Sequence, residues 1–180
     1  LSSIGDIVLT SLVVRCLKSQ LENAEIHFVT KQQFVCILKS NPYIDKIHVF
    51  EDNLGDLINE LAPEKFNFII DLHHNFRSGR IKRNIKAKAF SVNKLNLQKM
   101  LLINFKIHRL PNKHIVDRYL ETVAPLQIKN DGKGLDFFIP EKEQFVINDL
   151  PGPFQKGYVA FVIAGTYATK KLPVEKISEI

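Results

Sequence analysis

Along the first half of the chain, apolar positions follow the helical period in some stretches and form short β-type runs in others. In residues 7–20 the apolar side chains recur at helical spacing, and Arg15 and Lys18 fall on the opposite face. The β-type runs are rich in branched and aromatic side chains, which favour strands. The pattern predicts these elements in chain order: a helix over 7–20, a strand over 24–30, a helix over 31–40, a strand over 44–50, a short helix ending near Pro63, a strand over 66–72, a basic helix over 77–88 and a strand over 87–92.

Strands and helices that alternate through short connections pair in parallel through right-handed crossovers. The run at 66–72 is almost continuously apolar, which is typical of a strand covered on both faces. The predicted fold class is therefore α/β, a Rossmann-like doubly wound parallel sheet. A strand normally precedes the first helix of such a sheet, so we expect the natural protein to continue upstream of Leu1. Because that strand lies mid-sheet and pairs with two neighbours, we expect the 180 residues alone to be poorly stable.

Proline and glycine divide the second half of the chain. Residues 95–124 follow a helical pattern, and residues 130–140 supply turn residues and a short strand. The Pro- and Gly-rich stretch at 149–157 indicates a linker, and residues 158–166 form an apolar run typical of a buried strand. Pro173 suits the first turn of a further helix. These signals predict an N-terminal domain at 1–148, a linker at 149–157 and the beginning of a second domain at 158–180.

Charge and composition narrow the function classes. The net charge of +6 favours an anionic partner, and the positive charges crowd into residues 77–88, where no aromatic side chain is available to stack on nucleic-acid bases. Cys16 and Cys36 lie in apolar helical patterns without metal-binding spacing, so we interpret both as buried, reduced thiols. No apolar run reaches about 18 residues, the length that predicts a membrane span. The phosphate loop of NTPases, the dinucleotide fingerprint and the nucleophile elbow are absent, which argues against kinase, dehydrogenase and α/β-hydrolase activities.

The candidate chemistry lies where the strands end and the helices begin, which is the ligand-binding edge of open parallel sheets. Gly5 permits a positive φ or the close approach of a ligand. Asp6 has two interpretations, either a helix N-cap that accepts backbone amides or a general base that takes a proton from an attacking hydroxyl. Arg77 and Ser78 follow the strand ending at Asp71 and should face the same cleft as Asp6.

No metal site is expected from the sequence. His73 and His74 are adjacent on an extended segment, so their side chains point to opposite faces. No carboxylate–cysteine cluster accompanies them. We therefore predict a site without metal and without a bound cofactor.

Four stretches, in the same order along the chain, resemble glycosyltransferase family 9, the ADP-heptose:lipopolysaccharide heptosyltransferases and their relatives. The resemblance covers nearly the whole sequence. It rests on SSIGDIVLTSLVVRCLK (2–18), NPYIDKIHVF (41–50), FNFIIDLHHNFRSGRI (66–81) and VIAGTYATKKLP (162–173). The last stretch departs from many relatives in having Tyr167 in place of His, and from some in having Thr166 in place of Lys.

The resemblance implies a B-type glycosyltransferase fold of two Rossmann-like domains, with the acceptor on the N-terminal domain and the nucleotide sugar on the C-terminal one. It implies metal-independent, inverting transfer of a heptose or related sugar from an ADP-sugar substrate to a lipopolysaccharide core acceptor. Asp6 matches the catalytic base, and the position of Lys170 matches a lysine at the donor diphosphate. The other residues assigned are Ser3, Gly5, Arg77, Ser78, His114 and Arg118 for the acceptor, and Thr166 and Thr169 for the donor.

The same resemblance implies a cytoplasmic enzyme acting at the inner face of the inner membrane, where the basic helix 77–88 makes a peripheral contact with the anionic surface. Because most of the donor domain is absent, the 180 residues alone are expected to be inactive. The alternative is a non-catalytic Rossmann-like module that binds an anionic ligand or nucleic acid through its basic face.

Overall fold

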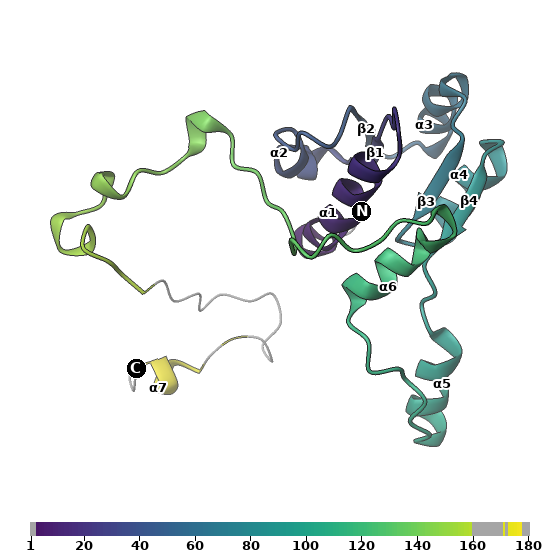
Figure 1. Ribbon diagram of the computed structural model, residues 1–180. Coiled ribbons are helices and arrows are strands. Elements are labelled where there is room, and N and C mark those ends of the chain that lie inside the picture. The colour runs from purple at the N-terminus through teal and green to yellow at the C-terminus, as the bar shows by residue number, and fades with distance from the viewer. Residues whose placement is uncertain (1–2, 160–170, 172, 178–180) are drawn as a thin grey trace. The chain divides into compact units, whose positions relative to one another are not determined.

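The computed structural model describes residues 3–159, 171 and 173–177 (Figure 1). The chain divides into two units, residues 1–140 and 141–180. The first unit therefore ends before residue 148, where the sequence placed the end of the N-terminal domain. The alternation of helices and strands predicted for the first unit is confirmed. Its elements are α1 (Ile4–Gln20), β1 (His27–Lys31), α2 (Val35–Leu38), β2 (Lys46–Phe50), α3 (Leu54–Leu61), β3 (Phe68–Asp71), α4 (Phe76–Asn84), β4 (Lys88–Ser91), α5 (Asn96–Phe105) and α6 (Ile115–Thr122).

The four strands pair in parallel, as predicted, in two sheets of two strands each. In the first sheet His27 of β1 lies opposite Lys46 of β2, and in the second Phe68 of β3 lies opposite Lys88 of β4. Residues of both β1 and β3 line a single pocket, so these two strands face each other across it. The first strand expected upstream of Leu1 stays a prediction.

Three hydrophobic clusters hold these elements together. Leu12, Val13 and Cys16 on α1 pack with Tyr119 and Val123 of the α6 region. A second cluster joins β2, α3 and the end of α4, and a third joins α1 to the α2 region. Burial of apolar side chains at about 25 cal/mol per Å² is the main force that holds α1, α3 and α6 in place. No residue of α5 is buried.

Two local predictions are wrong. The short strand predicted within 130–140 does not form, since residues 135–140 pair with no described strand. The turn residues predicted there are present, with φ of +75° at Gly132 and +73° at Gly134. This segment is instead held by side chains, since the Ser11 hydroxyl accepts a hydrogen bond from the Asp136 amide at 2.9 Å. Cys16 is buried as expected, but Cys36 is exposed, because the predicted helix over 31–40 shortens to a 3₁₀ turn and the single turn of α2.

The second unit, up to residue 159, contains only short 3₁₀ turns, at Glu141–Glu143, Ile147–Asp149 and Gly152–Phe154. The helix predicted after Pro173 is present as α7 (Val174–Ile177). Most of the predicted strand at 158–166 lies outside the described residues. Among the described helices, none is both long and apolar enough to cross a membrane.

Candidate functional site

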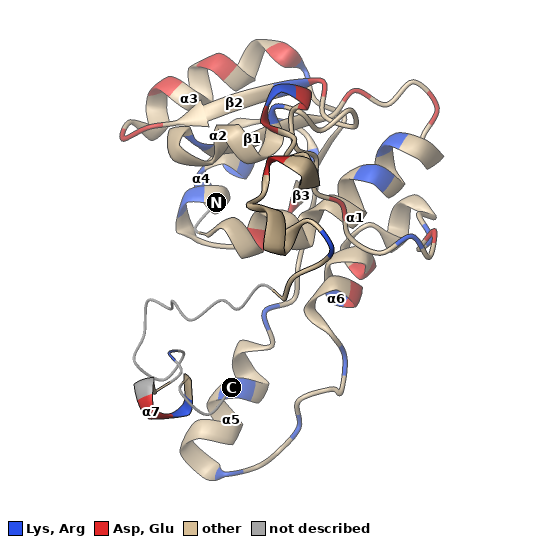
Figure 2. Cartoon of the chain, turned by 90° about the vertical axis from the view of Figure 1, so that its left-hand side faces the viewer, with Lys and Arg blue, Asp and Glu red and all other residues tan. Residues whose placement is uncertain are grey.

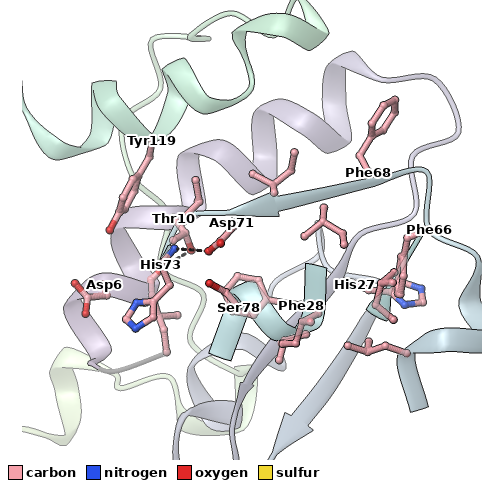
Figure 3. Close-up of a pocket in the computed structure, with 18 residues that line it drawn as sticks. Asp6, Thr10, His27, Phe28, Phe66, Phe68, Asp71, His73, Ser78 and Tyr119 are labelled. Carbon is pink, nitrogen blue, oxygen red and sulfur yellow. Dashed lines mark hydrogen bonds between the residues drawn. The ribbon is translucent and has the colours of Figure 1, made fainter. Parts of the chain in front are cut away.

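The candidate site is one end of a pocket between β1 and β3, to which α1, α4 and α6 also contribute. The two ends of the pocket differ in chemistry (Figure 3). Asp6, Thr10, His73 and Tyr119 lie at one end, which is polar, whereas the opposite end carries aromatic rings such as Phe66. The polar end contains the carboxyl end of β3 and the first turn of α1, which is where ligands bind in open parallel sheets.

Ser3, not Asp6, is the N-cap of α1. Ser3 has an extended backbone, and its Oγ accepts a hydrogen bond from the Asp6 amide at 3.1 Å. Asp6 is the third residue of the helix, so its amide is capped while its half-buried side chain lines the pocket. The N-cap interpretation of Asp6 is therefore wrong, because the capping position was already taken three residues earlier. The carboxylate remains favourably placed at the positive end of the helix dipole.

Gly5 does not use its special conformational freedom. It lies inside α1 and is not among the residues with positive φ. A Cβ at this position would meet only Ser3 Oγ, at an ordinary contact distance of 3.9 Å. The positive φ considered for Gly5 is thus wrong, and the close approach of a ligand stays a prediction.

Asp71, the last residue of β3, binds the backbone of the loop that follows it at the polar end of the pocket. Its Oδ1 accepts hydrogen bonds from the amides of His73 at 3.1 Å and His74 at 2.6 Å, and its Oδ2 lies 2.6 Å from the Lys82 ammonium. Burial alone would raise the pKa of Asp71, but the bonds from Lys82, the His74 amide and Ser78 outweigh it and lower that pKa. The side chain is 3% exposed and is ionised at neutral pH.

His73 and Tyr119 complete the polar end. Burial, with help from the positive charge of Lys94, lowers the pKa of His73, although Asp6 and Asp71 act in the opposite direction. Burial and the Asp6 charge raise the pKa of Tyr119. At neutral pH the pocket therefore offers an uncharged imidazole and a protonated phenol beside a carboxylate. Such a set can accept a proton at one atom and hold a hydroxyl in place with the others.

Ser78 lines this pocket, as predicted, but Arg77 is not among its lining residues. Ser78 and Asn75 form a capping box at the start of α4, with both reciprocal bonds at 2.9 Å. The Arg77 guanidinium instead lies over the Phe50 ring, 5.3 Å from its centroid. Adjacent helical residues point about 100° apart, so one of the pair reaches the pocket and the other does not.

His114 and Arg118 are not among the residues that line this pocket. His114 is the N-cap of α6, and its Nδ1 accepts a hydrogen bond from the Val116 amide at 3.3 Å. Arg118 donates to the carbonyl of Asn93 and lines a separate pocket. Their acceptor-binding role stays a prediction.

The donor residues Thr166, Thr169 and Lys170 lie outside the described residues, so their role also stays a prediction. Sequence reasoning did not place Thr10 or Tyr119 at the polar end, and it considered His73 only as a metal ligand. His73 carried a signal, because it follows the strand-ending Asp71. Tyr119 did not, since only the packing of α6 against α1 brings it to the pocket.

Parallel strands joined by crossover helices, with a polar pocket at the carboxyl end of β3, define a Rossmann-like α/β domain, as expected for half of a B-type glycosyltransferase fold. Comparison with known proteins supports this class. The chain is similar to a glycosyl transferase family 9 protein from Veillonella parvula, with a TM-score of 0.59 and 25% identity, covering 79% of this chain and 44% of that one.

In sequence the chain is 27% identical over 129 residues to lipopolysaccharide heptosyltransferase 1 of Campylobacter coli, covering 67% of this chain and 38% of that relative. No family model matches the chain. The resemblance to glycosyltransferase family 9 is thus confirmed by both a sequence relative and a solved structure. The chain spans about two-fifths of the length of these two proteins.

Proposed function

We propose that this chain is the acceptor-binding part of an inverting glycosyltransferase that moves a heptose, or a related sugar, from an ADP-sugar to a lipopolysaccharide core acceptor. The observation that carries the proposal is the position of Asp6. Ser3 caps the helix, so the Asp6 carboxylate lines a pocket at the ligand-binding edge of the fold. The two relatives, a lipopolysaccharide heptosyltransferase and a family 9 glycosyl transferase, support the choice of reaction.

In the proposed reaction Asp6 takes the proton from an acceptor hydroxyl. The freed oxygen forms a bond to the anomeric carbon of the donor sugar, and the bond from that carbon to the diphosphate breaks with inversion. Lys170, with the hydroxyls of Thr166 and Thr169, would stabilise the departing ADP. The phenol of Tyr119 and the neutral imidazole of His73 are suited to orient the acceptor sugar.

The basic helix gives the proposal a second element, contact with an anionic membrane surface. Arg80 and Arg83 of α4 are exposed, and Figure 2 shows Lys and Arg residues along this helix. Lys82 is turned inward to Asp71 and does not contribute to this surface. Each exposed cation near an anionic bilayer is worth about 1 kcal/mol, enough for a peripheral contact.

The decisive experiment is Asp6→Asn in the full-length protein. We expect turnover to fall by about 10²- to 10⁴-fold, because general-base catalysis contributes that much, while the affinity for ADP stays unchanged. Asp56→Asn is the matched control. Asp56 is exposed in the first turn of α3, and its substitution removes the same charge from a helix start. Turnover of Asp6→Asn equal to that of the wild type would remove Asp6 from the mechanism.

A binding experiment separates the enzyme from the non-catalytic alternative. Calorimetric titration of the full-length protein with ADP should give saturable binding, and titration with single-stranded nucleic acid should give none. The opposite result would favour a module that binds anions through the basic face of α4.

A further inference from the structure

A cluster of two histidines and a glutamate joins β1, β2 and the turn after α3. It consists of His27, His48 and Glu64, whose potential ligand atoms all lie within 4.8 Å of one another. His48 is fully buried, the side chain of His27 is 7% exposed and that of Glu64 is 26% exposed. His27 lies at the end of the pocket away from Asp6 (Figure 3), so the cluster is separate from the proposed transfer site.

One nitrogen of each imidazole ring points toward the other ring. His27 Nδ1 and His48 Nε2 are 2.9 Å apart. The remaining nitrogens contact carboxylates, His27 Nε2 with Glu25 at 2.9 Å and His48 Nδ1 with Glu60 at 2.5 Å. A carboxylate only accepts hydrogen bonds, so each outer nitrogen carries the hydrogen of its ring.

In neutral rings the two facing nitrogens therefore both present lone pairs. Two lone pairs at 2.9 Å repel each other unless a cation lies between them. That cation is either one extra proton or a metal ion. Three carboxylates surround the pair, those of Glu25, Glu60 and Glu64, and this negative charge favours a divalent ion.

The spacing of the cluster suits zinc. Two imidazole nitrogens bound to tetrahedral Zn²⁺ at 2.0–2.1 Å lie about 3.3 Å apart, so the observed pair needs to separate by only a few tenths of an ångström. Metal-bound histidines usually donate their other N–H to a carboxylate, which Glu25 and Glu60 already accept here. Glu64 forms an ion pair with Lys46 through Oε1, and its carboxylate has a second oxygen for a metal.

We propose that His27 Nδ1, His48 Nε2 and a carboxylate oxygen of Glu64 bind one Zn²⁺ ion, with water as the fourth ligand. The ion would link the first residue of β1, the middle of β2 and the 3₁₀ turn Ala62–Glu64. Its role is to stabilise this side of the domain, independently of the transfer reaction. The rings of Phe66 and His27 pack in a T-shaped arrangement beside the site, with centroids 5.1 Å apart.

The test is calorimetric titration with ZnCl₂ of the full-length protein after removal of metals by a chelator. We expect His27→Ala to bind one zinc fewer than the wild type, and Glu64→Gln to bind that zinc at least 10-fold more weakly. Glu60→Gln should weaken it about 10- to 100-fold, the usual effect of losing a carboxylate that supports a ligand. Co²⁺ in place of Zn²⁺ should give tetrahedral visible absorption bands in the wild type and none in His27→Ala.

His73→Ala is the matched control, because it removes a half-buried histidine outside the cluster and should leave zinc binding unchanged. His48 is buried, so a substitution there risks unfolding the protein. The test therefore uses the His27 and Glu64 variants, and circular dichroism checks that both are folded. Zinc should also raise the melting temperature of the wild type but not of His27→Ala. Absence of stoichiometric binding to the wild type, or equal binding by His27→Ala, would overturn the proposal and leave a shared proton between the rings.

Discussion

α1 carries a charged residue in each half, and the surroundings of the two charges differ. In the second half Arg15 is 3% exposed, and its guanidinium is enclosed by Asp131, Asp136 and the carbonyl of Gly134. In the first turn Asp6 faces a pocket, with a neutral imidazole and a phenol nearby. The first arrangement is closed by the chain itself, whereas the second opens to a space that a ligand can fill.

The difference teaches how a charge that holds the fold is distinguished from one that serves a site. Hydrogen bonding to Asp131 raises the pKa of Arg15, and the same bond lowers the pKa of Asp131, so both groups stay charged. At the polar end of the pocket, burial shifts the pKa values of His73 and Tyr119 toward their neutral forms. Groups poised to exchange or share protons mark the site, and matched ion pairs mark the scaffold.

The largest stability effect is expected at the closed half. Arg15→Met leaves Asp131 and Asp136 without their partner and should cost about 3–5 kcal/mol in the free energy of unfolding, measured by urea denaturation. Arg83→Met is the control, because Arg83 is exposed on α4 and its loss should change stability by less than about 0.5 kcal/mol. Equal effects of the two substitutions would show that the buried ion pairs do not hold the segment around residues 131–136.

A smaller, pH-dependent effect is expected at the floor of the pocket. The pKa of Asp71 is lowered in the folded protein, so its contribution to stability is present above the ordinary carboxyl pKa of about 3.9 and is lost as the pH falls through the folded value. Asp71→Asn should therefore cost about 1.5–3 kcal/mol at pH 7, and the cost should shrink as the pH falls below the ordinary carboxyl pKa. Urea unfolding of both proteins across this range measures the difference.

Lys82→Met provides the control for that measurement, since it removes the ammonium paired with Asp71 but leaves the His73 and His74 amide bonds. A cost for Asp71→Asn that is independent of pH would contradict the role of its ionised form. The cost of Asp71→Asn would then come from packing rather than from electrostatics.

The smallest effect is expected at the helix start. Ser3→Ala removes the side-chain acceptor of the Asp6 amide and should cost about 1 kcal/mol in unfolding free energy, whereas Ser3→Asp should retain most of the stability. Thermal unfolding of the two variants measures this cost. If Ser3→Ala were as stable as the wild type, Ser3 would not be the working cap, and Asp6 would again be the candidate for that role.

Local pattern carried most of the element prediction. Periodicity placed α1, α3 and α4 and the four strands, because burial of one helical face or of both strand faces leaves its mark on consecutive residues. The end of each element was less certain, since capping depends on the backbone angles of single residues. Asp6 was the cap that the sequence suggested, and only the helix start at Ile4 shows that Ser3 holds that position.

By itself, the sequence determined the α/β class, the parallel pairing, the place of Asp6 at a helix start and the resemblance to glycosyltransferase family 9. The tertiary structure alone decided that Tyr119 reaches the pocket, that Arg77 lies over Phe50 and that Arg118 lines another pocket. It also brought Arg15 to Asp131 and His27 to His48. The physical reason is range: periodicity records which face of an element is buried, whereas contacts between distant segments depend on how whole elements pack.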